Sequence, residues 1–582
     1  MKNLISDLHV HCGLKGYASE GHPDFKDHTI WDFYPAREEE LKKLNPVLRM
    51  AIKELAKSSQ ANLDACAASN LRAPFLAIYP VERQMFALEP QKPFQFFFDI
   101  FLSGKQHAYL GAAVAGFPLE KVEAILANVS NDKDEGVNYY NQFRMERDYL
   151  LRQTETRSKH FPDFRFEVAS NYQEFRTSLE AGKTICGLFT VEGAHSFGEY
   201  LHNSTFKKEF EELLPAERQT LITSFLQNIT EVKTEEDGKN APFFVTFCHH
   251  FNNLLAGHAR SFSAKSNLAL GLHKPGMRHL FNQEPGLNKG FSGLGKEVLE
   301  LFLDRKAGRR ILIDTKHMSV TARKEFYQVI RKKREEENDS IPIIHSHAAI
   351  NGWFSLDQAR TKAETKELDE GHFFSRWQIN LTNEDILEMY DSDGIIGVVL
   401  HEGRMPGDGF KKAAGKLKKK MAKSRAGSPR RARLERELKD MYLKLVWSNI
   451  FHIIKVVKEG RSESDTAANG WKMIALGSDY DGLVDPLNSF PEVASFPELK
   501  REMIDYLKSG KEICFAQNGV AQPLPDAEVR ELMFGQSAEA ILDGILFGNT
   551  DHFLGKYFTE AYLGQETGEA DEATGQEISV AA

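Results

Sequence analysis

The chain has few cysteines and no long apolar run. Its 582 residues include only five cysteines, scattered along the sequence at Cys12, Cys66, Cys186, Cys248 and Cys514. This pattern is typical of reduced thiols in a cytoplasm rather than of a disulfide framework. No stretch approaches the roughly 18 apolar residues of a membrane-spanning helix, and the first residues lack the apolar centre of a signal peptide. We therefore expect a cytoplasmic protein without a membrane span.

Acidic residues are missing from one stretch of an otherwise acidic chain. Residues 411–433 contain 11 lysines and arginines and no acid; subtracting these from the net charge of −9 leaves −20 for the rest of the chain. No aromatic residues interleave these cations, and no recognisable fold presents them, so we expect a solvated, low-complexity insertion. A nucleic-acid partner is not expected.

What the sequence does contain is a repeated pattern of short apolar runs. With 41% hydrophobic and 11% aromatic residues, the chain has enough apolar material to form a globular core. Runs buried on both faces are typical of strands in parallel sheets, and helical spacing separates them here. Eight strands alternating with helices predict a (β/α)8 barrel of the TIM type. The expected strands are residues 4–10, 74–79, 184–191, 242–248, 310–314, 341–345, 394–400 and 473–477.

The spacing between these runs is irregular. The longest intervals exceed what a compact crossover needs, so the barrel is expected to carry inserted segments. We predict one barrel domain over residues 1–560, followed by a disordered acidic tail at 564–582. Besides the basic insertion at 411–433, the expected insertions lie near residues 81–137, 198–239 and 258–290. These are predicted to form lids or rims over a pocket, or an oligomer surface.

Polar residues with metal-binding chemistry follow several expected strands. In a barrel of this kind functional groups lie at the carboxyl ends of the strands. His9 and His11 end the first strand, and strand alternation places both on one face, within reach of one metal ion. A single His-x-His pair is expected by chance, but ligand-type residues at five strand ends together predict a metal site. The other four ends carry Glu192, His317, His347 and Asp479, and His249 follows the fourth expected strand.

Motifs that run in order through most of the chain resemble a known family. The chain is similar to membrane dipeptidases, the renal dipeptidase-type peptidases of the amidohydrolase superfamily. Two blocks are the most specific, Glu192-Gly193-x-His195-Ser196 and Ile313-Asp314-x-x-His317-x-Ser319. The resemblance is also carried by Asp7-Leu8-His9-Val10-His11, His249-His250, His345-Ser346-His347, and Gly477-Ser478-Asp479-Tyr480-Asp481.

The resemblance implies a site for two divalent metal ions, with zinc expected. It assigns His9, His11 and Glu192 to the first ion, and Glu192, His317 and His347 to the second, so that Glu192 bridges the pair. Such a site activates water for attack on a C–N amide bond of a dipeptide or small amide. By the same resemblance Asp479 transfers the proton and His249 contacts the substrate carbonyl. A homodimer is compatible with the family pattern.

Two positions depart from that pattern. The family usually has an aspartate where this chain has His11, which is also a good zinc ligand but removes one negative charge from the site. Ile379 stands where the family has the arginine that binds the substrate carboxylate, and Arg376 is the nearby candidate to replace it. Dipeptides are therefore in doubt as substrates, and a neutral amide is an alternative.

Two further interpretations remain open. The same metal site is able to hydrolyse an ester, a lactone or a phosphoester, because it activates water whatever the leaving group. Alternatively, the chain is an inactive dipeptidase-like scaffold or binding protein, which the loss of the arginine favours and the retained set of ligands opposes.

Overall fold

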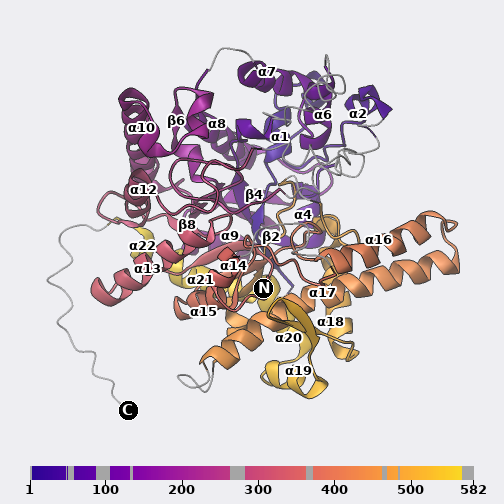
Figure 1. Ribbon diagram of the computed structural model, residues 1–582. Helices are drawn as coiled ribbons and strands as arrows, with labels where there is room; N and C mark the ends of the chain where they lie inside the picture. Colours follow the sequence, from indigo (N-terminus) through magenta and orange to yellow (C-terminus); the bar gives the residue numbers. More distant parts are fainter. Residues whose placement is uncertain are drawn as a thin grey trace.

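The computed structural model shows a barrel of parallel strands surrounded by helices (Figure 1). It describes residues 3–46, 49, 58–86, 105–130, 135–262, 282–361, 371–461, 468–482 and 485–565. Eight strands follow one another around the barrel in chain order. They are β1 (Ile5–Val10), β2 (Leu71–Ile78), β5 (Thr184–Glu192), β7 (Phe244–Thr246), β8 (Leu312–Asp314), β9 (Ile344–Ala348), β10 (Ile395–Val398) and β11 (Ile474–Leu476).

The first and last strands meet at the site end of the barrel. The amide of Asp479 donates to the carbonyl of His9 at 2.9 Å, and the amide of His11 donates to that of Tyr480 at 2.9 Å. All seven other neighbouring pairs are parallel. The (β/α)8 barrel predicted from the sequence is therefore confirmed, and each expected strand overlaps one of the eight.

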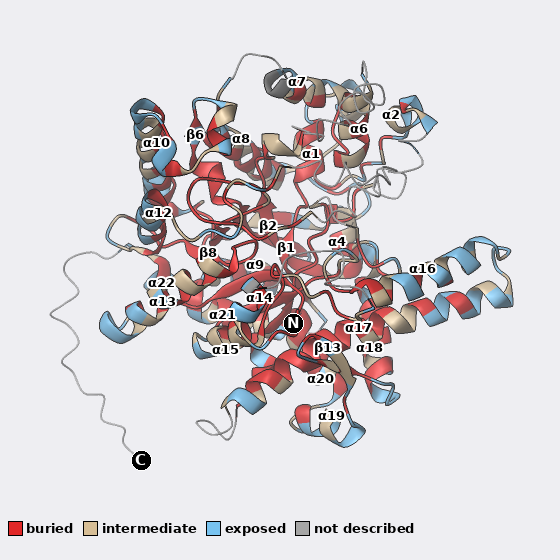
Figure 2. Ribbon diagram, in the orientation of Figure 1, coloured by how far each residue is buried: buried red, intermediate tan, exposed pale blue. Residues whose placement is uncertain are grey.

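Helices cover the outside of the barrel between the strands. Their apolar faces pack on strands that are buried along their whole length, and Figure 2 shows this buried centre in red. The covering helices include α4 (Leu63–Ser69), α8 (Tyr139–Arg152), α9 (Tyr172–Glu180), α10 (Pro215–Thr234), α12 (Gly293–Leu303), α13 (Val320–Glu336), α15 (Asn383–Asp391), α17 (Pro429–Arg461), α18 (Phe496–Lys508), α20 (Ala538–Asp543) and α21 (Asn549–Tyr557).

Several elements lie outside this regular pattern. Strand β4 (Arg165–Val168) pairs with the first half of β5, and two small antiparallel sheets join β3 (Val137–Asn138) to β6 (Glu199–Tyr200) and β12 (Cys514–Gln517) to β13 (Val520–Pro523). The shorter helices α1 (Leu14–Ser19), α2 (Glu38–Lys43), α6 (Gln106–Ala115), α7 (Leu119–Ser130), α14 (Leu356–Thr361), α19 (Asp526–Leu532) and α22 (Glu560–Leu563) complete the chain. Helices α6 and α7 belong to the expected insertion near 81–137 and form a second small apolar core with α1.

The expected insertions are described only in part. Residues 87–104 and 131–134 of the first and residues 263–281 of the third lie outside the described part of the chain, as do residues 566–582 of the expected tail. The basic segment 411–433 is helical except for a turn at residues 423–428, which joins α16 (Asp408–Ala422) to the start of α17. Among the described residues, no helix has the length and apolar character needed to cross a bilayer.

Candidate metal centre

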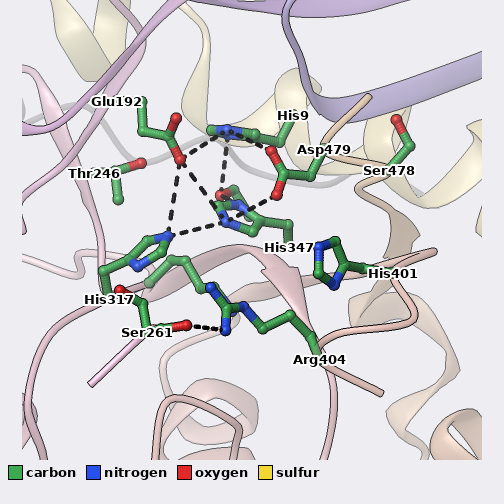
Figure 3. A network of polar contacts seen from close by, with 12 residues as sticks. His9, Glu192, Thr246, Ser261, His317, His347, His401, Arg404, Ser478 and Asp479 are labelled. Atoms are coloured by element: carbon green, nitrogen blue, oxygen red, sulfur yellow. Dashed lines mark hydrogen bonds and ion pairs between the residues drawn. The ribbon is translucent and has the colours of Figure 1, made fainter. Parts of the chain in front are cut away.

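One carboxylate lies at the centre of five histidines at the carboxyl ends of the strands. Oε1 of Glu192 lies 3.3 Å from Nε2 of His9, 3.8 Å from Nε2 of His317 and 3.9 Å from Nε2 of His347. Its Oε2 lies 3.3 Å from Nε2 of His11. Figure 3 shows Glu192, His9, His317 and His347 pointing toward one another, with Asp479 beside them. The fifth ring, His249, has its Nε2 3.3 Å from Oε1 of Glu192.

These side chains form two groups that share Glu192. Ligand atoms of His9, His11, Glu192 and Asp479 all lie within 4.8 Å of one another, and so do those of Glu192, His317 and His347. The structure thus brings together every residue that the sequence predicts as a metal ligand, in two overlapping groups. Asp479 joins the first group as an additional oxygen donor.

The chemistry of these residues fits divalent cations. Nε2 of His9 and Nε2 of His11 are buried and make no hydrogen bond within the described chain, although each faces a carboxylate oxygen. Burial and neighbouring imidazoles lower the pKa of His317 and His347 well below the usual range, which keeps both rings neutral and their lone pairs free. Neutral imidazoles around a bridging carboxylate form the donor set that zinc prefers.

The electrostatics of Glu192 also favour cations at this point. Burial alone would raise the pKa of this carboxyl, but the imidazoles of His249 and His9 outweigh burial and hold it well below its usual range. Glu192 is therefore ionised although it is buried. An ionised carboxylate in a barrel interior needs positive partners, which metal ions supply.

Strand-end hydrogen bonds fix the orientation of the ligands. The Oγ of Ser346 lies 2.9 Å from Nδ1 of His347 and 3.4 Å from Nδ1 of His9, and it donates to Asp314 at 2.6 Å. Asp314 also accepts hydrogen bonds from Thr246 Oγ1 and from two backbone amides, so its oxygens are already satisfied. Asp314 also forms a group of potential ligands with His9 and His347, but its hydrogen bond from Ser346 links it to both of these rings and is suited to orienting them.

The backbone at the site adopts conformations that most residues avoid. His317 has a φ of 65° and Asp479 a φ of 63°, both in the left-handed region. Gly193 follows Glu192 with a φ of 96°, and a Cβ there would lie 2.3 Å from Nδ1 of His195. Glycine adopts this conformation freely, whereas the strain at His317 and Asp479 is typical of sites that place side chains for chemistry.

The carboxyl of Asp479 has a raised pKa. Burial and the neighbouring Glu192 raise the pKa of its carboxyl to about 6, against the opposing effect of His9. Its side chain keeps 13% of its surface exposed, whereas that of Glu192 keeps 3%. Within the described site, Asp479 is therefore the carboxylate more open to solvent or substrate.

His249 is held by a carboxylate that the sequence analysis did not identify. Oε2 of Glu82 lies 2.6 Å from Nδ1 of His249 and accepts from the Tyr79 hydroxyl at 3.2 Å, while Oε1 accepts from the Phe251 amide at 3.1 Å. Burial alone would lower the pKa of His249, but Glu192 and Glu82 together raise it to about 10. A protonated ring held in this way directs an N–H from Nε2 into the site.

Arg404 is a second residue that no motif indicated. Its Nη1 donates to the carbonyl of Ser261 at 2.5 Å, and Figure 3 shows its side chain beside His401 and next to the cluster. Burial lowers its pKa to about 10, with Asp479 and Glu192 acting in the opposite direction, so the guanidinium stays charged. Arg376, the sequence candidate, instead lies 2.8 Å from Nε2 of His372, with its guanidinium over the ring of Trp353.

The other histidines at the strand ends have local partners. Nδ1 of His345 lies 3.0 Å from Thr315 Oγ1, and Nε2 of His195 lies 2.8 Å from the carbonyl of Pro80. His250 stacks on His249 with ring centroids 3.8 Å apart and has its Nδ1 2.8 Å from Ser261 Oγ. His249, His250 and His317 form a further group of potential ligands, but that group lacks a carboxylate.

Solved structures with a related overall fold are dipeptidases by title. No protein-family model matches the chain, and no curated protein matches it. It is similar to a metallopeptidase named dipeptidase AC (12% identity, TM-score 0.44, covering 96% of this chain and 99% of that one). It is also similar to a Rhodobacter sphaeroides metallopeptidase solved with a phosphinate mimic of L-Ala-D-Ala (12% identity, TM-score 0.44, covering 95% of this chain and 99% of that one). A third similar structure is the probable dipeptidase PvdM of Pseudomonas aeruginosa (14% identity, TM-score 0.41, covering 86% of this chain and 89% of that one).

These titles name the family that the motifs resemble. At such identities and TM-scores the likeness carries no residue roles to this chain. The function proposed below therefore rests on the arrangement of the site itself.

Proposed function

We propose that this protein is a hydrolase with two divalent metal ions, zinc being expected, that cleaves a C–N bond in a dipeptide or small amide. The observation that carries this proposal is the position of Glu192, whose two oxygens lie 3.3–3.9 Å from histidines in or just after β1, β8 and β9. The first ion would be held by His9, His11 and Glu192, and the second by Glu192, His317 and His347. When bound, such a pair makes water nucleophilic at neutral pH and polarises a carbonyl.

The protein's own groups would carry the proton and orient the substrate. Asp479 would take a proton from the attacking water and deliver it to the leaving nitrogen, because its carboxyl titrates near neutral pH and is the more exposed of the two at the site. The Nε2–H of His249 would donate to the carbonyl oxygen as negative charge develops there. Glu82 would keep that ring protonated and in place.

Arg404 would bind the substrate's free carboxylate. It supplies a charged guanidinium next to the cluster from the loop after β10, whereas the family's arginine position is filled by Ile379, which is buried. A guanidinium is suited to a carboxylate because it donates two parallel hydrogen bonds. Arg404 in place of Arg376 therefore keeps dipeptides within the proposed substrate class.

A substrate panel tests this proposal. Protein reconstituted with zinc is assayed against L,L- and L,D-dipeptides, their C-terminal amides, lactones, esters and phosphoesters, with Asp479→Asn as the control for contaminating hydrolases. Turnover of dipeptides that disappears in the variant supports the proposal. Turnover of lactones or phosphoesters alone would support the alternative hydrolase, and an inert protein that holds both metals would support a scaffold.

A further inference from the structure

The basic segment forms the end of a helical hairpin that projects from the barrel. Helix α16 and the first half of α17 lie side by side and extend away from the body of the protein (Figure 1). Their shared face is apolar, with Phe410, Ala414 and Leu417 buried against Leu434 and Leu438. Figure 2 shows that the outer faces of the hairpin are exposed. The cations are thus presented by a packed element.

Four lysines form a stripe along the outer face of α16. Lys416, Lys419, Lys420 and Lys423 are spaced by three and four residues, which places them on one side of the helix, opposite the buried face. All four are exposed. The stripe spans about 10 Å of helix axis. Arg425, Arg430 and Arg433 continue the positive surface around the turn and onto α17.

No carboxylate neutralises this stripe. Within the described chain the four lysines and the three arginines make no ion pair, whereas Lys418, on another face of α16, pairs with Glu402 at 2.7 Å. Seven exposed like charges on one hairpin repel one another, and an external polyanion would relieve that repulsion. The rest of the chain is strongly acidic, so the hairpin holds its charge away from a body that would repel the same ligand.

We propose that the hairpin, through the stripe from Lys416 to Lys423, binds the phosphate backbone of a nucleic-acid duplex without reading its sequence. The exposed surface of the hairpin carries none of the large exposed apolar side chains of the described chain, so it has no group to insert into a lipid bilayer and no apolar anchor for a protein partner. It also has no exposed aromatic ring on which single-stranded bases would stack. A row of lysines is complementary to a row of phosphates.

The hairpin presents its cations away from the body of the protein. The stripe lies on the outer half of α16 and ends at the turn of the hairpin, and in Figure 1 the hairpin projects beyond the body. A duplex is narrow enough to contact the hairpin alone. This inference reverses the expectation from sequence, because that expectation assumed that no fold presented the cations.

Binding of a fluorescent 20-base-pair duplex, as DNA and as RNA, tests the proposal by anisotropy over a series of salt concentrations. The stripe variant is K416Q/K419Q/K420Q/K423Q, which keeps helix propensity because glutamine and lysine are similar helix formers. The control variant removes the same charge from exposed lysines of the body, as K239Q/K296Q/K306Q/K472Q. Circular dichroism and hydrolytic activity check that both variants are folded.

We expect the wild type and the control variant to bind both duplexes at low salt. The slope of log affinity against log salt should be about −3.6 or steeper, at roughly −0.9 for each phosphate neutralised. The stripe variant should lose at least tenfold in affinity and most of that slope. No binding by the wild type at 50 mM salt, or equal binding by the two variants, would overturn the proposal. So would binding only to phosphatidylserine vesicles, or only self-association that the stripe variant abolishes.

Discussion

Oε2 of Glu82 lies 2.6 Å from Nδ1 of His249, and this contact leaves Nε2 of the same ring facing Glu192. The pair joins a loop after β2 to the end of β7, so it exists only in the folded barrel. It sets both the protonation and the orientation of the histidine that is proposed to contact the substrate carbonyl.

Replacing Glu82 with glutamine should reduce kcat by a larger factor than it reduces the metal content per chain. The amide no longer holds His249 protonated, so the donor to the developing oxyanion is weakened; a loss of about 10- to 100-fold is typical for such supporting groups. Steady-state kinetics and metal analysis of Glu82→Gln provide the measurement, with the exposed Glu199→Gln as a matched control. Unchanged kcat would show that His249 does not depend on this carboxylate.

Arg404→Gln should raise KM for dipeptides about 10- to 100-fold, because a charge-assisted hydrogen bond contributes about 1.5–3 kcal/mol. The matching dipeptide amides, which lack the carboxylate, should be affected little. Arg376→Gln is the discriminating control, and its KM should stay close to that of the wild type. If Arg376→Gln alone raised KM, the sequence prediction would be right and the assignment to Arg404 wrong.

Asp479→Asn should abolish most turnover. An amide at this position has no ionisable carboxyl to take a proton, and loss of a general acid–base group costs about 10²- to 10⁴-fold in kcat. Single-turnover kinetics on the metal-loaded variant separate this effect from weaker metal binding. Activity within a factor of three of the wild type, at full metal content, would exclude Asp479 as the proton carrier.

Glu146, which is not one of the proposed metal ligands, should make the stability of the protein depend on pH. Burial raises the pKa of this carboxyl to about 7; Oε2 accepts from the Tyr79 amide at 3.1 Å, an effect in the opposite direction. The folded state therefore holds a proton that the unfolded state has lost between about pH 4.5 and 7, so this group lowers the free energy of unfolding as pH rises through that interval. Above pH 7 the buried carboxyl lowers the free energy of unfolding by its full amount, about 3 kcal/mol.

Glu146→Gln should remove that cost. Urea denaturation at pH 5 and pH 8 is expected to show a stabilised variant at pH 8 and little difference from the wild type at pH 5. The exposed Glu155→Gln serves as the control. A variant destabilised equally at both pH values would show that Glu146 is ionised in the folded protein.

The sequence was most informative about the barrel because its strands are buried on both faces. Short continuous apolar runs such as residues 184–191 are recognisable as strands of this kind, and the ligands at strand ends then follow from position. Strand β4 was missed because it is short and only half buried. The helical hairpin was missed because its few buried apolar residues, such as Phe410 and Leu417, are separated in the sequence by many lysines.

Residues that act through tertiary contacts could not be predicted from the sequence. Glu82 and Arg404 lie in loops, carry no motif, and become candidates only when folding brings them to the cluster. The left-handed backbone at His317 and Asp479 was not predicted either, because histidine and aspartate adopt it more often than most residues but still rarely. The specific motifs therefore predicted the ligands, but not the groups that hold them or the group proposed to bind the substrate.

Metal content per chain tests the central claim most directly. The protein is loaded with zinc, freed of excess ions and analysed as the wild type, Glu192→Ala, His317→Ala and the surface control Glu199→Ala. We expect about two zinc ions in the wild type and the control, and clearly fewer in both site variants, because Glu192 would serve both ions and His317 one. A wild type without metal, or a Glu192→Ala variant that keeps two ions, would contradict the account.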